Sequence, residues 1–260
     1  MKPTGLMKLT VLGSGSTVPH PQRASSAYWL ETSGGSILLD CSASVGSRMA
    51  AAGLDWPELD AIWISHFHLD HVGGLPALLA GTKHAEPMKK REKPLTVFGP
   101  EGLKDLIDGF SDVNNYRLLE QPFPVGVVEV EELEKFAILP GVEAVAMSTP
   151  HTAESHAIHI RDCRTTFVYT ADTSFDEKIV AFAQNVDLLL MECTYPKDKP
   201  KKKHLELAEA MFLIRKAKPK RAMLTHFYPE WDDVDFEQAV KEFDPFCEVI
   251  EAKDGLSLDV

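Results

Sequence analysis

The sequence predicts an α/β fold in which two β-sheets pack together and are covered by helices. Apolar runs of strand length, bounded by Gly, Pro, Asn and Asp, recur through the whole chain. Helical periodicity separates some of these runs, and the predicted strands outnumber the predicted helices by about two to one. Consecutive strands interrupted by single helices differ from the strict strand–helix alternation of a doubly wound parallel sheet.

Taken in order, the expected strands lie at residues 8–13, 27–31, 37–40, 61–65, 95–99, 136–139, 142–147, 157–160, 166–170, 187–192 and 221–225. The expected helices lie at 42–52, 75–79, 101–110, 175–182 and 204–217. No composition break, low-complexity linker or repeat divides the 260 residues, so we expect one domain over 1–260. Whether the Pro- and Glu-rich stretch 120–135 forms a lid, an interface or a surface hairpin stays open.

Composition argues against an integral membrane protein and a disulfide scaffold. The longest apolar runs fall far short of the ~20 residues that span a bilayer. The first residues lack an apolar signal core, so we expect a cytoplasmic protein. The four cysteines form no Cys-x-x-Cys pair, which argues against a disulfide framework and a thiolate zinc site.

The formal net charge of −12 disfavours non-specific binding to a nucleic-acid backbone, which requires clustered Lys and Arg. Positive charge is nevertheless concentrated in two runs, at residues 89–93 and 197–203. Each run is either a solvated loop or a local basic patch, and both interpretations stay open.

One segment carries the strongest chemical signal. The strand at 61–65 leads directly into His66, His68, Asp70 and His71. In an extended chain, residues two apart point the same way, so the first three side chains can face one centre while His71 reaches it from the adjacent position. The alternative is a set of solvated loop residues, but four titratable side chains beside bulky apolar neighbours would be desolvated without a partner. A metal ion supplies that partner.

This HxHxDH segment at a strand end resembles the first metal motif of the metallo-β-lactamase fold superfamily. Three later residues, each after a predicted strand, match the remaining motifs in order: His151, Asp172 and His226. Taken alone, each histidine would be a hydrogen-bonded loop residue and Asp172 a helix N-cap. The resemblance extends to residue 226 and implies an αββα four-layer sandwich of two mixed β-sheets flanked by helices.

The family pattern also implies two divalent metal ions. One would be bound by His66, His68 and His151. The other would be bound by Asp70, His71 and His226, with Asp172 shared between the two. His68 stands where iron-dependent electron-transfer relatives carry Glu, which favours a hydrolytic pair, and imidazole-rich sites suit zinc. Manganese and iron are the alternatives.

Within the superfamily, the chain resembles the ribonuclease Z-like phosphodiesterases. The opening Leu-Gly-Ser-Gly-Ser-Thr-Val-Pro resembles the glycine turn of that branch. Glu192 and Thr194 resemble residues of its HEAT motif, and His204 resembles the His that opens the next helix.

Two departures from that branch argue against transfer RNA as the substrate. Only 172 − 151 = 21 positions separate His151 from Asp172, too few for the long arm of those enzymes. Met191 also replaces the first His of the HEAT motif. The basic run that ends at Lys203 is a candidate to replace part of the function of this arm.

These observations predict a metal-dependent hydrolase. The leading hypothesis is a phosphodiesterase that uses a hydroxide bound between two metals. The expected substrate is a small or short nucleotide-like phosphodiester. Asp70 would bind metal and accept a proton from the water, and His204 would donate a proton to the leaving oxygen. The alternative for His204 is an exposed residue beside a helix N-cap.

Two rival functions use the same residues. The first is hydrolysis of a lactone, thioester or other acyl compound, because a fold does not select a reaction. The second is a binding protein that retains metal without turnover. The resemblance alone also implies a homodimer.

Overall fold

The computed structural model describes residues 7–163, 165–200 and 203–260. The strands of the first sheet are β1 (Lys8–Gly13), β2 (Ala27–Thr32), β3 (Gly35–Leu39), β4 (Ala61–Trp63), β5 (Leu95–Gly99), β6 (Val125–Glu129) and β14 (Ser257–Asp259). Those of the second sheet are β7 (Lys135–Leu139), β8 (Val142–Ser148), β9 (His156–Asp162), β10 (Thr165–Tyr169), β11 (Leu188–Glu192), β12 (Arg221–Thr225) and β13 (Glu248–Glu251).

Within the described ranges, the α-helices are α1 (Val45–Ala51), α2 (Leu69–Val72), α3 (Leu75–Thr82), α4 (Glu86–Lys90), α5 (Leu103–Asp112), α6 (Lys178–Phe182), α7 (Leu207–Ala217) and α8 (Phe236–Lys241). Short 3-10 turns cover Trp56–Glu58 and Pro229–Trp231. None of the described helices is long and apolar enough to cross a bilayer.

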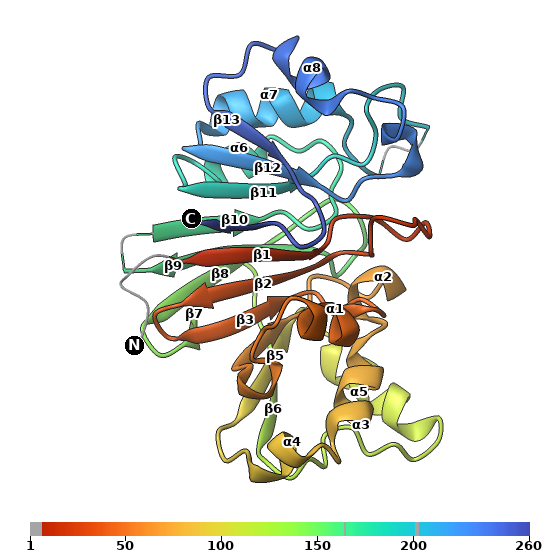
Figure 1. Cartoon of the computed structure of the whole chain (residues 1–260). Helices are drawn as coiled ribbons and strands as arrows, with labels where there is room; N and C mark the ends of the chain where they lie inside the picture. The colour runs from red at the N-terminus through yellow and green to blue at the C-terminus, as the bar shows by residue number, and fades with distance from the viewer. Residues whose placement is uncertain (1–6, 164, 201–202) are drawn as a thin grey trace.

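The two sheets have matching plans. The strand order is β14-β1-β2-β3-β4-β5-β6 in the first sheet and β13-β12-β11-β10-β9-β8-β7 in the second. Figure 1 labels these strands except β4 and β14. In the first sheet, β14 to β3 pair antiparallel and β3 to β6 pair parallel. In the second, β7 to β10 pair antiparallel and β10 to β13 pair parallel. Both sheets are therefore mixed.

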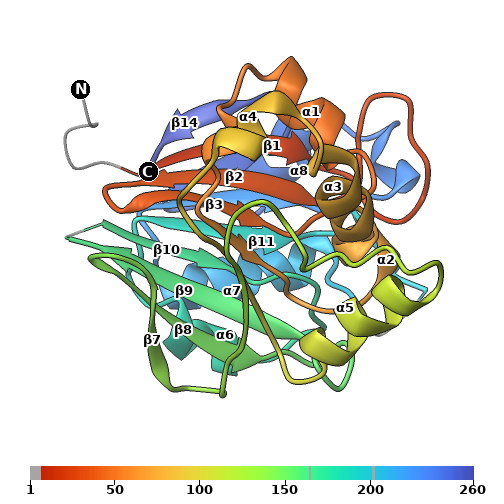
Figure 2. The same cartoon turned by 90° about the horizontal axis from the view of Figure 1, so that it is seen from below.

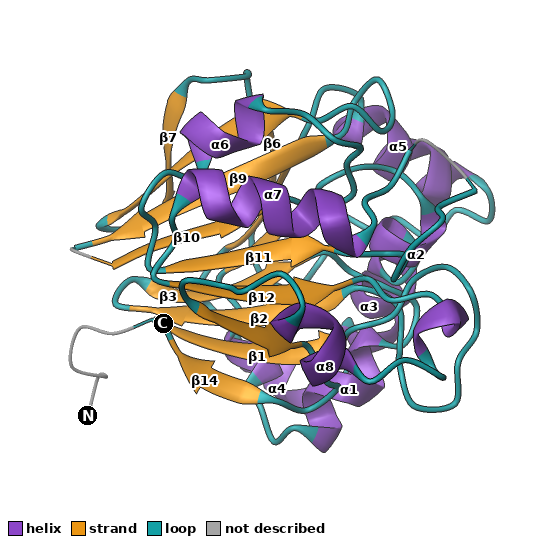
Figure 3. Ribbon diagram, turned by 90° about the horizontal axis from the view of Figure 1, so that it is seen from above, coloured by secondary structure: helices purple, strands orange, loops and turns teal. Residues whose placement is uncertain are grey.

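Alternating side chains explain why the sheets form the two middle layers. On β2, Tyr28 and Leu30 face the core between the sheets, whereas Trp29 faces the helices outside the first sheet. Helices α1, α3, α4 and α5 cover that outer face (Figure 2), while α6, α7 and α8 lie outside the second sheet (Figure 3). Both faces of the central strands of each sheet are buried, which gives the predicted αββα sandwich.

Every predicted strand and helix is present, with ends shifted by up to three residues. The sequence analysis missed β6, β13, β14, α2, α4 and α8. Because β6 pairs with β5 at the edge of the first sheet, the stretch 120–135 holds an edge strand before the chain crosses to β7. It is not a surface hairpin.

The basic run 89–93 is not a free cationic patch. Arg91 is buried, donates hydrogen bonds to four backbone carbonyls and lies 4.7 Å from the centre of the Phe123 ring. Lys93 forms ion pairs with Glu58 and Asp60. These two cations therefore stabilise the connections between strands.

Candidate metal centre

The candidate ligands meet where strands of both sheets end. The HxHxDH segment follows β4, and His151, Asp172 and His226 follow β8, β10 and β12. The backbone is extended at His68 and then turns into α2, so Asp70 and His71 reach the centre from a helical turn. The expectation of an extended segment through Asp70 is wrong, because the chain folds back there against the first sheet: the amide of Cys41 donates to the carbonyl of His71.

The backbone is left-handed just after three strands, β3, β10 and β12. Asp40 after β3, Ala171 after β10 and His226 after β12 have φ values of 58°, 51° and 61°. L-residues adopt this conformation at a cost of about 1 kcal/mol or more, so it indicates turns that the surrounding structure holds in place.

The side chains form two groups of candidate metal ligands, called the first and second ligand groups below. In the first ligand group, donor atoms of His66, His68 and His151 lie within 4.8 Å of one another and of Asp172. Nδ1 of His68 is only 3.1 Å from Nε2 of His151. The second ligand group consists of Asp70, His71 and His226, whose donor atoms also lie within 4.8 Å of one another.

Asp172 lies between the two groups. Its Oδ2 is 3.6 Å from Nε2 of His151 and 3.9 Å from Nε2 of His66. Its Oδ1 is 3.3 Å from Nε2 of both His71 and His226. One carboxylate oxygen therefore faces each ligand group.

Buried atoms without hydrogen-bond partners show that these residues fit a metal ion. Among the described residues, such atoms include Nε2 of His66, His71 and His226 and Oδ1 of Asp172. Leaving a buried polar atom unpaired costs about 1–3 kcal/mol, so these four atoms indicate that each ligand group lacks a partner. Nitrogen and carboxylate donors of this kind suit zinc.

Each of these imidazoles is also oriented through its other nitrogen, as is usual for metal-binding histidines. Nδ1 of His66 lies 3.0 Å from Ser65 Oγ, and Nδ1 of His71 lies 2.6 Å from Asp40 Oδ2. Nδ1 of His226 lies 3.0 Å from Thr194 Oγ1. Nδ1 of His151 donates to the backbone carbonyl of Lys203 at 2.9 Å.

The electrostatics differ between the groups. Burial lowers the pKa of His66 and His151, which keeps these imidazoles neutral. Burial alone would also lower the pKa of His71, but the carboxylates of Asp172 and Asp40 raise it well above the ordinary value. Burial would raise the pKa of Asp70, yet contact with His226 and His71 lowers it, so Asp70 is ionised.

Glu192 and His204 form a buried pair beside the ligands. The Glu192 carboxylate accepts hydrogen bonds from His204 Nδ1, Thr194 Oγ1 and the backbone amides of Thr173 and Leu205. His204 is only 7% exposed, and α7 begins three residues later, so the exposed alternative for His204 is wrong. Burial would lower the pKa of His204, but Glu192 raises it.

A pocket of 390 Å³ opens over the two ligand groups. It is lined by Thr17, His68, Leu69, Asp70, His151, Asp172, Lys203, His204, His226 and Tyr228. The sequence analysis did not identify Thr17 or Tyr228. Tyr228 lies two residues after His226, and Thr17 lies in the opening Leu-Gly-Ser-Gly-Ser-Thr-Val-Pro segment, so both positions offered a usable signal.

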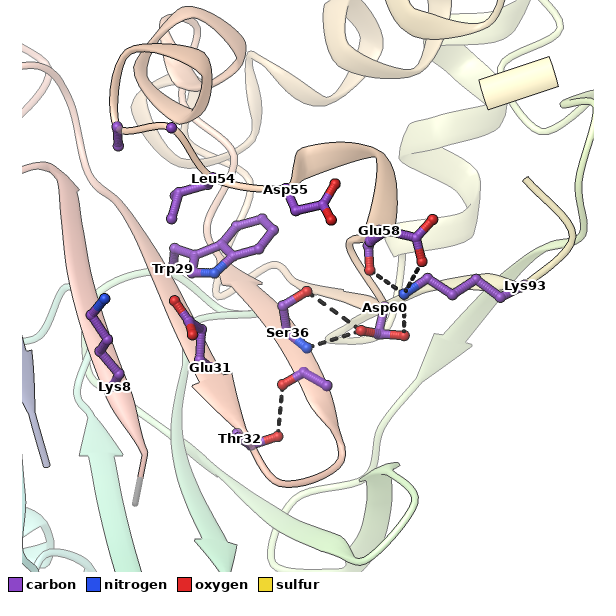
Figure 4. Close-up of a pocket in the computed structure, with 13 residues that line it drawn as sticks. Lys8, Trp29, Glu31, Thr32, Ser36, Leu54, Asp55, Glu58, Asp60 and Lys93 are labelled. Atoms are coloured by element: carbon purple, nitrogen blue, oxygen red, sulfur yellow. Dashed lines mark hydrogen bonds and ion pairs between the residues drawn. The ribbon is translucent and has the colours of Figure 1, made fainter. Parts of the chain in front are cut away.

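A larger cavity than the pocket over the ligand groups lies elsewhere on the molecule. A cavity of 680 Å³ lies on the outer side of β1 to β3, with Trp29 facing it and Lys93 held by Glu58 and Asp60 (Figure 4). No cluster of three candidate metal ligands in the described part of the chain lies there.

Comparison with curated proteins identifies relatives over most of the chain. Ribonuclease Z of Agathobacter rectalis is 25% identical over 276 residues, covering 86% of this chain and 88% of the relative. The probable metallo-hydrolase YhfI of Bacillus subtilis is 26% identical over 222 residues, covering 85% of this chain and 86% of the relative.

Two solved structures show the same fold. The metallo-β-lactamase fold protein YhfI of Bacillus subtilis superposes with a TM-score of 0.77 and 24% identity, covering 98% of this chain and 100% of that one. Zinc-bound PqqB of Methylobacterium extorquens gives a TM-score of 0.76 and 17% identity, covering 97% of this chain and 100% of that one.

A family model described as Anti-Pycsar protein Apyc1 matches residues 7–249, which is most of the chain. The curated relatives are hydrolases, and the His and Asp cluster provides donors for metal. The chain is therefore a ribonuclease Z-like, metal-dependent hydrolase of the metallo-β-lactamase fold, and it belongs to the family described as Anti-Pycsar protein Apyc1.

Proposed function

We propose that the protein hydrolyses phosphodiester bonds in small or short nucleotide-like molecules. The observation that carries this proposal is the chemistry of the pocket wall. Lys203 and His204 can neutralise or hydrogen-bond phosphate oxygens, and Leu69 is the one aliphatic residue among the lining residues. An acyl pocket requires an apolar wall instead. The name of the ribonuclease Z relative supports the same phosphodiester chemistry.

The proposal includes two divalent ions, with zinc as the first choice because most donors are imidazoles. The two ligand groups would each hold one ion, and Asp172 would offer one oxygen to each. When bound, the ions would lower the pKa of the attacking water and polarise a phosphoryl oxygen.

The protein side chains would handle the protons. Asp70 is ionised and lines the pocket, so it can accept a proton from the attacking water. Glu192 binds Nδ1 of His204 and raises its pKa, which favours the protonated form, and His204 lines the pocket. His204 would donate its proton to the leaving oxygen.

The surroundings of the pocket favour a small substrate over transfer RNA. Strands β9 and β10 account for most of the segment between His151 and Asp172, so that segment has no room for a long arm. Lys203 lines the pocket, whereas Lys201 and Lys202 lie outside the described residues.

Hydrolysis of bis(p-nitrophenyl) phosphate by zinc- or manganese-reconstituted protein tests the proposal. Asp70→Ala should lower kcat/KM by at least about a thousandfold, because it removes a ligand and the proton acceptor. Asp112→Ala changes an exposed aspartate at the end of α5 and should retain full activity. Turnover of lactones or thioesters by protein that leaves every phosphodiester intact would establish acyl hydrolysis instead.

A further inference from the structure

Two buried tyrosines cross the interface between the sheets in opposite directions. Tyr28 on β2 and Tyr169 on β10 pack edge to face, with ring centroids 5.1 Å apart, and they are 0% and 2% exposed. The Tyr28 hydroxyl lies 2.8 Å from Thr225 Oγ1 on β12 of the second sheet. The Tyr169 hydroxyl donates to Asp40 Oδ2, after β3 of the first sheet, at 2.7 Å. Each hydroxyl therefore bonds a residue of the opposite sheet.

The partner of Tyr169 is connected to both ligand groups. Asp40 Oδ2 accepts from His71 Nδ1 at 2.6 Å and from Ser65 Oγ at 2.9 Å, and Oδ1 accepts from the Ser65 amide at 2.8 Å. Because the Ser65 hydroxyl donates to Asp40, it can accept from Nδ1 of His66 at 3.0 Å. Asp40 thus orients His71 directly and His66 through Ser65.

Asp40 is fully buried, so bulk solvent does not reach this carboxylate. Its position is set by its hydrogen-bond donors, and three of them share Oδ2. Removing one donor lets the carboxylate turn toward the other two, and it also concentrates negative charge on the oxygen that holds His71. Either change alters the direction and basicity of the Nε2 atom that faces Asp172.

We propose that Tyr169 is a positioning residue of the metal centre, which acts through Asp40 on His71. The proposal rests on the two-ion site proposed above. Tyr169 lies three residues before Asp172 on the same chain segment. That segment therefore delivers the carboxylate shared between the two ligand groups and the hydroxyl that fixes the partner of His71.

Tyr28 offers a matched control. It is buried to a similar extent and has the same ring contact and a hydrogen bond of similar length, but its partners are the hydroxyls of Thr225 and, at 3.5 Å, Ser26. Tyr28→Phe and Tyr169→Phe each remove one buried oxygen atom. A purely structural effect would therefore be similar in the two variants, whereas an effect through Asp40 would appear only in Tyr169→Phe.

Zinc titration of the metal-free full chain, in competition with a chromophoric chelator, tests the proposal. Tyr169→Phe should lower the affinity for one of the two zinc ions by about tenfold and change the affinity for the other by less than about threefold. In Tyr28→Phe, both zinc affinities should stay within about threefold of those of the unmodified protein. The visible absorption spectrum of the cobalt-substituted protein should change in Tyr169→Phe alone. Unchanged zinc affinity in Tyr169→Phe, or an equal loss in Tyr28→Phe, would overturn the proposal.

The melting temperature of each metal-free variant separates stability from metal affinity. If Tyr169→Phe is unfolded without metal, zinc-loaded proteins are treated with excess chelator, and faster zinc release from Tyr169→Phe than from Tyr28→Phe supports the proposal. Equal release rates contradict it. Fewer than two zinc ions in the unmodified protein would instead overturn the two-ion site, and this is measured before any variant.

Discussion

The two ligand groups are built from similar residues but differ in charge. The first consists of three imidazoles, and burial keeps two of them neutral by lowering the pKa of His66 and His151. The second contains the ionised Asp70, and its buried His71 lies between Asp172 and Asp40, which raise the His71 pKa. Without metal, His71 of the second group therefore binds a proton more readily than His66 and His151 of the first group.

This difference shows that ligand identity alone does not determine how a metal site behaves. Both groups place imidazole nitrogens within 4.8 Å of the other donors. The carboxylates behind and between those imidazoles decide which group must lose a proton before it binds metal. The difference between the two groups is testable by changing Asp172, by changing His204 and by acid titration.

The largest effect is expected from Asp172→Ala. This change removes the carboxylate that lies 3.3 Å from His71 and 3.6 Å from His151, so it should disrupt both groups at once. We expect fewer than two bound zinc ions and a kcat/KM lower by at least about a thousandfold. Native mass spectrometry and the phosphodiester assay measure both. Glu177→Ala, an exposed change nearby, is the control, and two firmly bound ions in Asp172→Ala would contradict the shared role.

His204→Ala tests whether His204 is a proton donor or a further metal ligand beside the second group. Donor atoms of His204, Asp172 and His226 also lie within 4.8 Å of one another, so His204 is geometrically able to be a ligand. As a proton donor, it should be needed most when the leaving oxygen is basic. We expect kcat to fall by about a hundredfold with an alkyl leaving group, and far less with p-nitrophenolate. Loss of a zinc ion in this variant would identify His204 as a ligand instead.

The smallest expected effect is a gradual loss of bound zinc as the pH falls. Protons compete with metal for His71 at a higher pH than for His66 and His151, because the pKa of His71 is raised and the other two are lowered. As the pH falls, the ion of the second group should leave first, with affinity changing by up to about tenfold per pH unit for each proton taken up. Zinc content against pH measures this order.

Asp70→Ala is the control for that titration, because its remaining ion belongs to the first group. That ion should be released at the lower of the two pH values seen in the unmodified protein. Release at the higher value would show that the assignment of the two ions is reversed.

The seven candidate ligands could be predicted because the HxHxDH segment indicates a metal site and the order of the family's later motifs assigns the other three. The HxHxDH segment follows the apolar strand β4, and the three later ligands follow strands with equally clear apolar runs. Their role as ligands stays a prediction, as does the homodimer. The contacts behind them could not be predicted. Tyr169 meets Asp40 across 129 positions of sequence, and no local pattern signals that contact.

The missed strands have a common physical cause. β6, β13 and β14 lie at sheet edges, and their side chains are mostly exposed or half-buried. Without two buried faces they lack a continuous apolar run, so tertiary pairing decides their structure rather than local sequence. The helical turn α2 was missed for a similar reason, since four residues are too few to show a helical period.

The left-handed backbone at Asp40, Ala171 and His226 bears on how this centre could be transplanted. A designer who copied only the ligand side chains onto regular strand ends would aim them in other directions, because each turn redirects the chain as it leaves the sheet. A graft that works therefore has to carry the three turns together with the side chains.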